Sequence, residues 1–250
     1  MTFYLAGDTY YRRFFSEEWS KDLKVDMLIS YAYIRNDTLE FKSHCRKFIL
    51  DSGAFTFFSK AKDKMNWEEY ADRYANFIKS NNIQDFFELD IDCLVGYDKV
   101  IQLRNRIEKS VGRQSIPVWH ISRGKEKFVR MCEEYPYVAF GGILTDGKST
   151  QEIEPFFPWF INTAHKNNAR IHGLGYTKTP MLHKLHFDSV DSSSWTCGNR
   201  FAALHKFDRK TGTMKFIRPG SEFRIKDAYG LCKHNFNEWV KFQEYARHHL

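Results

Sequence analysis

The chain has 250 residues, of which 42% are hydrophobic and 17% aromatic, so it is long and apolar enough for one large core, and a disordered or fibrous protein is excluded. The formal net charge of +7 favours an anionic partner, nucleic acid first, although many basic cytosolic enzymes carry a similar charge. No apolar run approaches the length of a membrane span, so we expect no membrane partner.

The five cysteines are widely spaced and include no Cys-x-x-Cys pair. This pattern argues against a disulfide framework and against a cysteine zinc site. It suits a reducing compartment, and we therefore expect a cytoplasmic protein without bound zinc.

Short apolar runs and helical patterns alternate along most of the chain. Strands are expected at residues 3–6, 27–31, 48–50, 86–89, 116–119, 138–140, 169–171 and from 187 onward. Helices are expected at 17–23, 67–79, 98–110, 125–135, 150–167 and 180–185, with Asn66 capping the second and Pro155 and Pro158 disturbing the start of the fifth. Eight strands with mostly helical connections predict a parallel sheet that closes into a single (β/α)8 TIM barrel.

The pattern changes after the eighth strand. Residues 201–205 and 215–217 flank a turn at 208–212 and predict a hairpin, and a helical pattern runs from Phe236 to the end. Residues 206–226 hold seven Lys or Arg against two Asp or Glu, a local charge of 7 − 2 = +5. We expect one domain, with the barrel over about 1–198 and a basic C-terminal extension over about 199–250.

Polar residues follow most of the expected strands, and a parallel barrel gathers its chemistry at these carboxyl ends. The endings are Asp51-Ser52-Gly53, Asp90-Ile91-Asp92, His120, Gly141-Gly142, His172-Gly173, and Asp188 with Asp191. Two carboxylates in one pocket can share the work of breaking a glycosidic bond. Any single Asp is more often a helix cap, but acids after three different strands favour a catalytic site.

Four of these segments resemble a known family. The segments are Asp51-Ser52-Gly53-Ala54-Phe55, Leu89-Asp90-Ile91-Asp92-Cys93, Phe140-Gly141-Gly142-Ile143-Leu144, and His172-Gly173-Leu174-Gly175 leading through Pro180 to Phe187-Asp188-Ser189-Val190. In this order they are similar to motifs of the tRNA-guanine transglycosylase superfamily. The likeness is greatest to the branch that inserts 7-deazaguanine bases into DNA.

The resemblance implies a role for each matching residue. Asp188 would be the nucleophile that attacks C1′ of the target nucleoside, and Asp51 would handle the proton of the departing or incoming base. Asp90 and Asp92 would read the N–H groups of a guanine-like base, with His120 standing where the family usually has Gln. The expected substrate-binding set is completed by Ser52, Gly53, Gly141, Gly142, His172, Gly173 and Asp191.

Two departures from the family bear on the substrate. The Pro-Thr-Arg that follows the family's nucleophile strand is replaced by Asp191-Ser192-Ser193-Ser194, and the C-terminal zinc site of three Cys and one His is absent from the sequence. Because the zinc-bearing part of the tRNA enzymes docks tRNA, DNA is favoured over tRNA. No cofactor is expected, and a free 7-deazaguanine base would be the co-substrate.

Basic residues outside the strand endings are candidates for contact with nucleic-acid phosphates, although each alone is more typical of a solvated surface. They are Arg12, Arg13, Arg123, Arg209, Lys210 and Arg218. Three hypotheses stay open: base exchange, excision of a base by water, which Asp191 and the three serines would favour, and a non-catalytic nucleic-acid-binding barrel. The sequence leaves the choice between DNA and RNA, and the identity of the incoming base, undecided.

Overall fold

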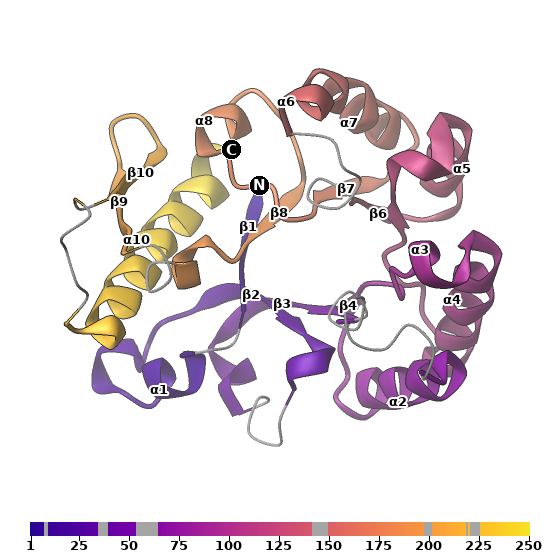
Figure 1. Ribbon diagram of the computed structural model, residues 1–250, viewed down its shortest axis with the longest axis horizontal. Coiled ribbons are helices and arrows are strands. Elements are labelled where there is room, and N and C mark those ends of the chain that lie inside the picture. The colour runs from indigo at the N-terminus through magenta and orange to yellow at the C-terminus, as the bar shows by residue number, and fades with distance from the viewer. Residues whose placement is uncertain are drawn as a thin grey trace.

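The computed structural model describes residues 1–7, 10–34, 40–53, 65–141, 150–197, 202–218, 220 and 226–250. Eight parallel strands form the central sheet, in the order β4-β3-β2-β1-β8-β7-β6-β5 (Figure 1). The strands are β1 (Thr2–Ala6), β2 (Val25–Ser30), β3 (Cys45–Asp51), β4 (Asp85–Phe86), β5 (Val118–Trp119), β6 (Tyr137–Phe140), β7 (Arg170–Gly173) and β8 (Ser189–Ser192).

The sheet closes on itself between β4 and β5. Phe87 and Ile116 form a parallel bridge there, and the backbone N–H of Glu88 donates to the carbonyl of Ile116 at 3.1 Å. The Glu88 carboxylate then accepts from the N–H of Val118 at 2.8 Å, so a side chain continues the hydrogen bonding where the short strand stops. This closure completes the (β/α)8 barrel that the sequence predicts.

Helices surround the sheet, as Figure 1 shows. They are α1 (Tyr11–Phe15), α2 (Trp67–Ser80), α3 (Asp92–Val95), α4 (Tyr97–Val111), α5 (Gly124–Glu134), α6 (Thr150–Ile153), α7 (Phe157–Lys166), α8 (Thr179–Leu182) and α10 (Ala228–His249). Short 3-10 turns are η1 (Glu18–Ser20), η2 (Tyr31–Tyr33), η3 (Glu40–His44), η5 (Ile121–Arg123), η6 (Glu154–Phe156) and η7 (Ser194–Cys197).

Most expected helices are confirmed, and one is wrong. Asn66 caps α2 as predicted, because its side chain accepts from the N–H of Glu69 at 3.1 Å. The helix expected at 17–23 is only the single turn η1. The expected helix does not form because the Ser20 hydroxyl donates to the carbonyls of Phe14 and Glu17 and so competes with helical hydrogen bonding.

Alternate residues of each strand face the barrel interior and the helical layer. The interior is filled by Tyr4, Ala6, Leu28, Ile49, Phe87, Ile116, Val118, Tyr137 and Ala139. In β1 the intervening Phe3 and Leu5 belong instead to the large cluster packed under the helices. Because successive strand residues point to opposite faces, the starting residue of a strand decides which side chains reach the interior.

The C-terminal extension consists of a two-stranded hairpin and α10. The hairpin strands β9 (Leu204–Asp208) and β10 (Thr213–Ile217) are antiparallel, as predicted, while α10 begins eight residues before the expected Phe236. The Gln243 amide ties α10 to the barrel: it donates to the carbonyls of Phe3 and Asp26 at 2.6 and 2.8 Å and accepts from the N–H of Asp26. Among the described helices, none is long and apolar enough to cross a membrane.

Candidate active site

Three carboxylates gather at the carboxyl end of the barrel. Asp51 ends β3, Asp90 follows β4, and Asp191 is the third residue of β8. Burial raises the pKa of Asp51 to about 6; a hydrogen bond from the N–H of Gly53 at 3.0 Å opposes the rise, and the charges of Asp90 and Asp191 add to it. Because the carboxyl ends of the parallel strands β3, β4 and β8 meet at one end of the barrel, the three acids share one mouth.

Asp188 does not belong to this group, and the expected grouping of Asp51, Asp90 and Asp188 is wrong. The eighth strand begins at Ser189, so Asp188 lies just before its amino end, where its carbonyl accepts from the N–H of Thr2 at 2.9 Å. Its carboxylate accepts from the N–H of Ile171 at 2.8 Å and lies 3.0 Å from Nε2 of His165 at the end of α7. Asp188 therefore stands at the rim opposite Asp51, in a structural role.

Asp191 takes the place at the mouth that was expected for Asp188. Its Oδ1 accepts from the N–H of Gly175 at 2.7 Å and lies 3.1 Å from Nε2 of His172, which is fully buried. Within the described part of the chain, Oδ2 of Asp191 has no hydrogen-bond partner. Oδ1 is therefore anchored by two hydrogen-bond partners.

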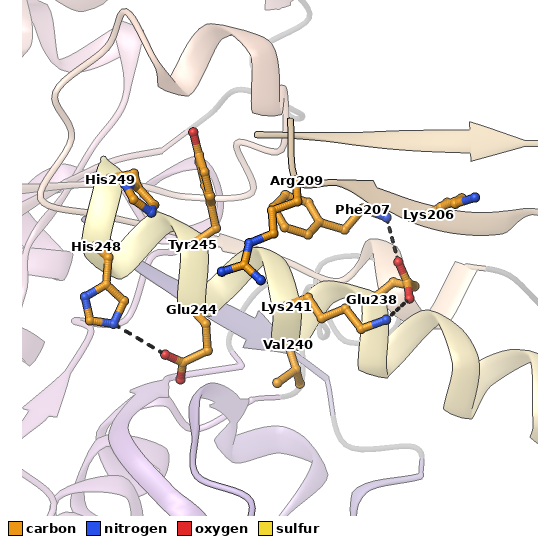
Figure 2. Close-up of a pocket in the computed structure, with 10 residues that line it drawn as sticks. All are labelled: Lys206, Phe207, Arg209, Glu238, Val240, Lys241, Glu244, Tyr245, His248 and His249. Atoms are coloured by element: carbon orange, nitrogen blue, oxygen red, sulfur yellow. Dashed lines mark hydrogen bonds and ion pairs between the residues drawn. The ribbon is translucent and has the colours of Figure 1, made fainter. Parts of the chain in front are cut away.

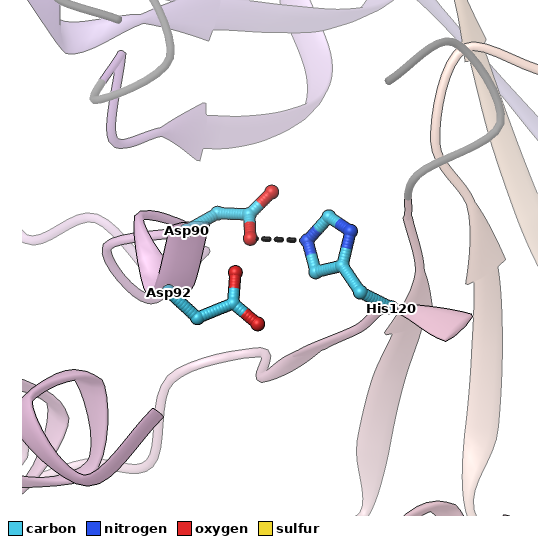
Figure 3. Close-up of side chains that lie close together, drawn as sticks. All are labelled: Asp90, Asp92 and His120. Carbon is cyan, nitrogen blue, oxygen red and sulfur yellow. Dashed lines mark hydrogen bonds and ion pairs between the residues drawn. The ribbon is translucent and has the colours of Figure 1, made fainter. Parts of the chain in front are cut away.

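Asp92 and His120 lie next to Asp90, and Figure 3 shows Asp90 directed at the His120 ring. Behind them the buried Arg123 holds three acids. Its Nε is 2.9 Å from Asp92, its Nη1 is 2.9 Å from Glu88, and its Nη2 is 3.9 Å from Asp90. The acids raise the pKa of Arg123 although burial opposes this, so the guanidinium stays charged.

The same three side chains have the composition of a metal site. One ligand atom from each of Asp90, Asp92 and His120 lies within 4.8 Å of the others, a set that could bind a divalent cation. The guanidinium of Arg123 already supplies positive charge to both carboxylates. The arrangement therefore fits an acceptor surface for N–H donors at least as well as a metal.

The glycines of the predicted site have packing roles. Gly53 has a φ of +69°, and a Cβ there would lie 2.5 Å from Cβ of Ala32, so only glycine fits after Asp51. A Cβ at Gly141 would lie 2.5 Å from Val118 and 3.2 Å from the His120 ring. Gly173 faces Phe187 in the helical layer. Ser52 is buried, its carbonyl accepting from the Tyr70 hydroxyl, and Gly142 lies outside the described residues.

The predicted phosphate contacts divide into separate groups. Arg123 is wrong as a surface contact, because its side chain is 1% exposed and engaged with acids. Arg13 lies on the mouth side, in the helix after β1, with its guanidinium 3.5 Å from the centre of the Tyr229 ring. Arg218 is exposed after β10, and the side chain of Arg12 is not described.

Arg209 and Lys210 are placed far from the mouth, in the turn between β9 and β10. This turn packs on Tyr245, since a Cβ at its Gly212 would be 2.5 Å from that ring. The next carbonyl along α10, that of Ala246, accepts from the N-terminal ammonium group, which precedes β1. The basic turn therefore lies towards the amino end of the barrel, away from Asp51.

A pocket of about 460 Å³ lies between β9 and α10 near this turn (Figure 2). Arg209 and Lys241 line it together with Glu238 and Glu244, and Lys241 is paired with Glu238. Its charges are of mixed sign and its position is remote from the acids at the mouth. We therefore do not assign it to the candidate active site.

The comparisons with known proteins add little to this geometry. No protein-family model and no curated protein matches the chain. A solved structure described as "QR15, an Aldolase" is similar over 77% of this chain and 89% of that chain, with 11% sequence identity and a TM-score of 0.46. A likeness at this level carries no argument about activity. The strand order and the cluster of acids define the chain as a (β/α)8 barrel with a polar mouth.

Sequence reasoning missed two groups of residues. Glu88, fully buried, closes the barrel and binds Arg123. Ser189 and Tyr137 lie behind His172 in the interior. For Ser189 the signal was the alternation of the strand, because Ser189 and Asp191 are two residues apart in β8 and so point to one side.

Proposed function

We propose that the chain is an enzyme that exchanges a guanine-like base in nucleic acid for a free 7-deazaguanine base, through a covalent intermediate on Asp191. The observation that carries the proposal is the shared mouth of Asp51, Asp90 and Asp191, in which the pKa of Asp51 is raised to about 6. A two-step displacement at a sugar carbon requires two carboxylates in one pocket, one as the nucleophile and one that transfers protons.

The reaction proceeds in two displacements. Oδ2 of Asp191 attacks C1′, the C1′–N bond breaks with its electron pair going to the base, and Asp51 in its acid form gives the base a proton. The incoming base then loses a proton to Asp51 and attacks C1′, and the ester bond to Asp191 breaks. Two inversions give net retention at C1′, and Asp51 ends each cycle protonated.

Asp90 and His120 are the proposed reading surface for the base. Asp90 is an acceptor, which suits the N1–H and exocyclic N–H donors of a guanine-like edge, and His120 lies against it and against Gly141. Adenine presents an acceptor at the ring position where guanine presents N1–H, so the same carboxylate would repel it. The target base must leave its stack to reach such a recessed group.

DNA is the favoured substrate on the sequence grounds given above. Among the predicted phosphate contacts whose side chains are described, Arg13 lies on the mouth side, and we propose that it contacts a phosphate there. Excision by water gains no support from Ser192, since its hydroxyl accepts from the N–H of Ser194 at 3.1 Å and so stabilises a turn. Three acids at the mouth would repel the phosphates of a nucleic acid, which argues against a barrel that only binds it.

Mass spectrometry of nucleosides tests the proposal. DNA and tRNA are incubated separately with the protein, with and without an isotope-labelled free 7-deazaguanine base, and are then digested. Incorporation of label into DNA only when the free base is present supports exchange. Abasic sites without any added base would support excision, and binding without either product would leave a non-catalytic barrel.

A further inference from the structure

A chain of hydrogen bonds runs through the barrel interior behind Asp191. The Tyr137 hydroxyl is 2.5 Å from Oγ of Ser189, Oγ of Ser189 is 2.6 Å from Nδ1 of His172, and Nε2 of His172 is 3.1 Å from Oδ1 of Asp191. The residues come from β6, β8, β7 and β8, and none is more than 7% exposed. Bulk solvent therefore has little contact with these groups.

The His172 ring is fixed by packing as well as by hydrogen bonds. Its centroid lies 5.3 Å from that of Phe87 and 6.0 Å from that of Tyr4, both in the barrel interior. A buried imidazole between an aromatic wall and a carboxylate has little freedom to turn. Its two nitrogens must therefore satisfy Ser189 on one side and Asp191 on the other.

The groups at the two ends, Tyr137 and Asp191, determine which atom donates in each of these hydrogen bonds. An ionised Asp191 can only accept, so Nε2 of His172 must carry the hydrogen that faces it. The neutral ring then offers the lone pair of Nδ1 to the Ser189 hydroxyl, whose oxygen in turn accepts from Tyr137. Burial raises the pKa of Tyr137 well above its usual value, which keeps this first donor protonated. The opposite direction would place the Nε2 lone pair against the carboxylate.

We propose that His172 is a positioning residue for Asp191, held in the Nε2–H tautomer by Ser189 and Tyr137; this rests on the proposed role of Asp191 as nucleophile. His172 and the N–H of Gly175 both bind Oδ1, so rotation of the carboxylate is restrained and Oδ2 is the oxygen that has no donor among the described residues. Fixing the attacking atom lowers the entropy cost of the first displacement. Because His172 is fully buried, it acts on the rate of attack and has no direct contact with either substrate.

The tautomer is measured directly by ¹⁵N NMR of the full chain labelled in histidine, with the His172 signals assigned by their loss in His172→Phe. The expected result is a protonated Nε2 and an unprotonated Nδ1. Phe keeps the ring volume beside Phe87 but offers no donor to Asp191. A protonated Nδ1 with a bare Nε2 would overturn the proposal.

Kinetics of three variants test the consequence. His172→Phe should lower kcat for base exchange by about 10- to 100-fold with KM for both substrates unchanged, a range typical of supports behind a reacting group. His172→Gln should recover most of this loss, because its amide nitrogen is as many bonds from Cβ as Nε2 and donates to the same oxygen. Ser189→Ala should lower kcat when introduced into the wild-type protein but should cause no further loss when introduced into His172→Phe.

Urea unfolding of each variant separates loss of positioning from loss of folding. Wild-type kcat in folded His172→Phe, or equal loss in the Gln and Phe variants, would contradict the proposal. If the wild-type protein exchanges no base in any nucleic acid, the proposed function fails instead. In that case the NMR measurement of the His172 tautomer alone tests whether these hydrogen bonds position Asp191.

Discussion

The placement of two aspartates at opposite ends of one strand gives a matched pair of variants. Asp191→Asn and Asp188→Asn make the same chemical change three residues apart. The first removes the proposed nucleophile at the mouth, and the second neutralises a carboxylate at the amino end. We expect base exchange to be lost only in Asp191→Asn, the reverse of the roles that the sequence resemblance implies.

The two magnitudes follow from the contacts. An amide cannot form the C1′ ester, so Asp191→Asn should lower kcat by about 10³-fold or more, equivalent to about 4 kcal/mol of transition-state stabilisation. Asp188→Asn keeps an oxygen for the N–H of Ile171, and it exchanges a charge-assisted hydrogen bond for a neutral one. The cost is about 1 kcal/mol of unfolding free energy, or about 2–4 °C in Tm, with kcat within about 2-fold of wild type.

The assay is incorporation of a labelled free base into DNA, read by nucleoside mass spectrometry, beside a thermal melt of each variant. A covalent protein–DNA adduct in wild type that is retained in Asp188→Asn and lost in Asp191→Asn would locate the ester. Full exchange by Asp191→Asn together with an inactive, folded Asp188→Asn would refute the reasoning from strand position.

Three further predictions concern charge. Because the pKa of Asp51 is about 6 when folded and about 3.9 in an unfolded chain, the folded state holds this proton more tightly and loses up to about 3 kcal/mol of stability as pH rises from 4 through 6. Asp51→Asn should therefore unfold at higher urea than wild type at pH 8 but not at pH 3.5, and kcat/KM of wild type should fall as pH rises through 6. Arg123→Met removes the closer of the two arginines that bind the buried Glu88, leaving Arg104 at 3.4 Å, and should lower the unfolding free energy by about 3 kcal/mol, whereas Arg106→Met at the exposed pair with Asp72 should change it much less, both by urea unfolding. Arg13→Ala should reduce the slope of log K against log salt for DNA binding by about 1, whereas Arg209→Ala at the far end should leave it unchanged.

Much of the fold could be read from the order of residues. Apolar runs that end in acids, His or Gly predicted the parallel barrel, because the side chains of β1 and β6 are buried on both faces and such strands appear as short continuous apolar runs. The cap at Asn66 and the hairpin after the eighth strand were also predicted. These features depend on local patterns of a few residues.

Local patterns could not place charged residues in three dimensions. Arg123 looks in the sequence like any surface arginine, but the turn before α5 directs it under Asp90 and Asp92. Arg209 and Lys210 look like part of one basic surface with Arg13, yet the packing of α10 puts them at the other end of the barrel. Such positions depend on contacts between segments 31 to 245 residues apart.

The sequence by itself determined that acids lie at or after the third, fourth and eighth strands, and that two of them, Asp188 and Asp191, are three residues apart at the last strand. Only the tertiary structure decided between these two. The pairing of Tyr4 with Asp191 and of His172 with Ser189 sets the register of β8. A strand reverses the direction of its side chains at every residue, so acids three apart cannot face the same way, and the register puts Asp191 in the mouth.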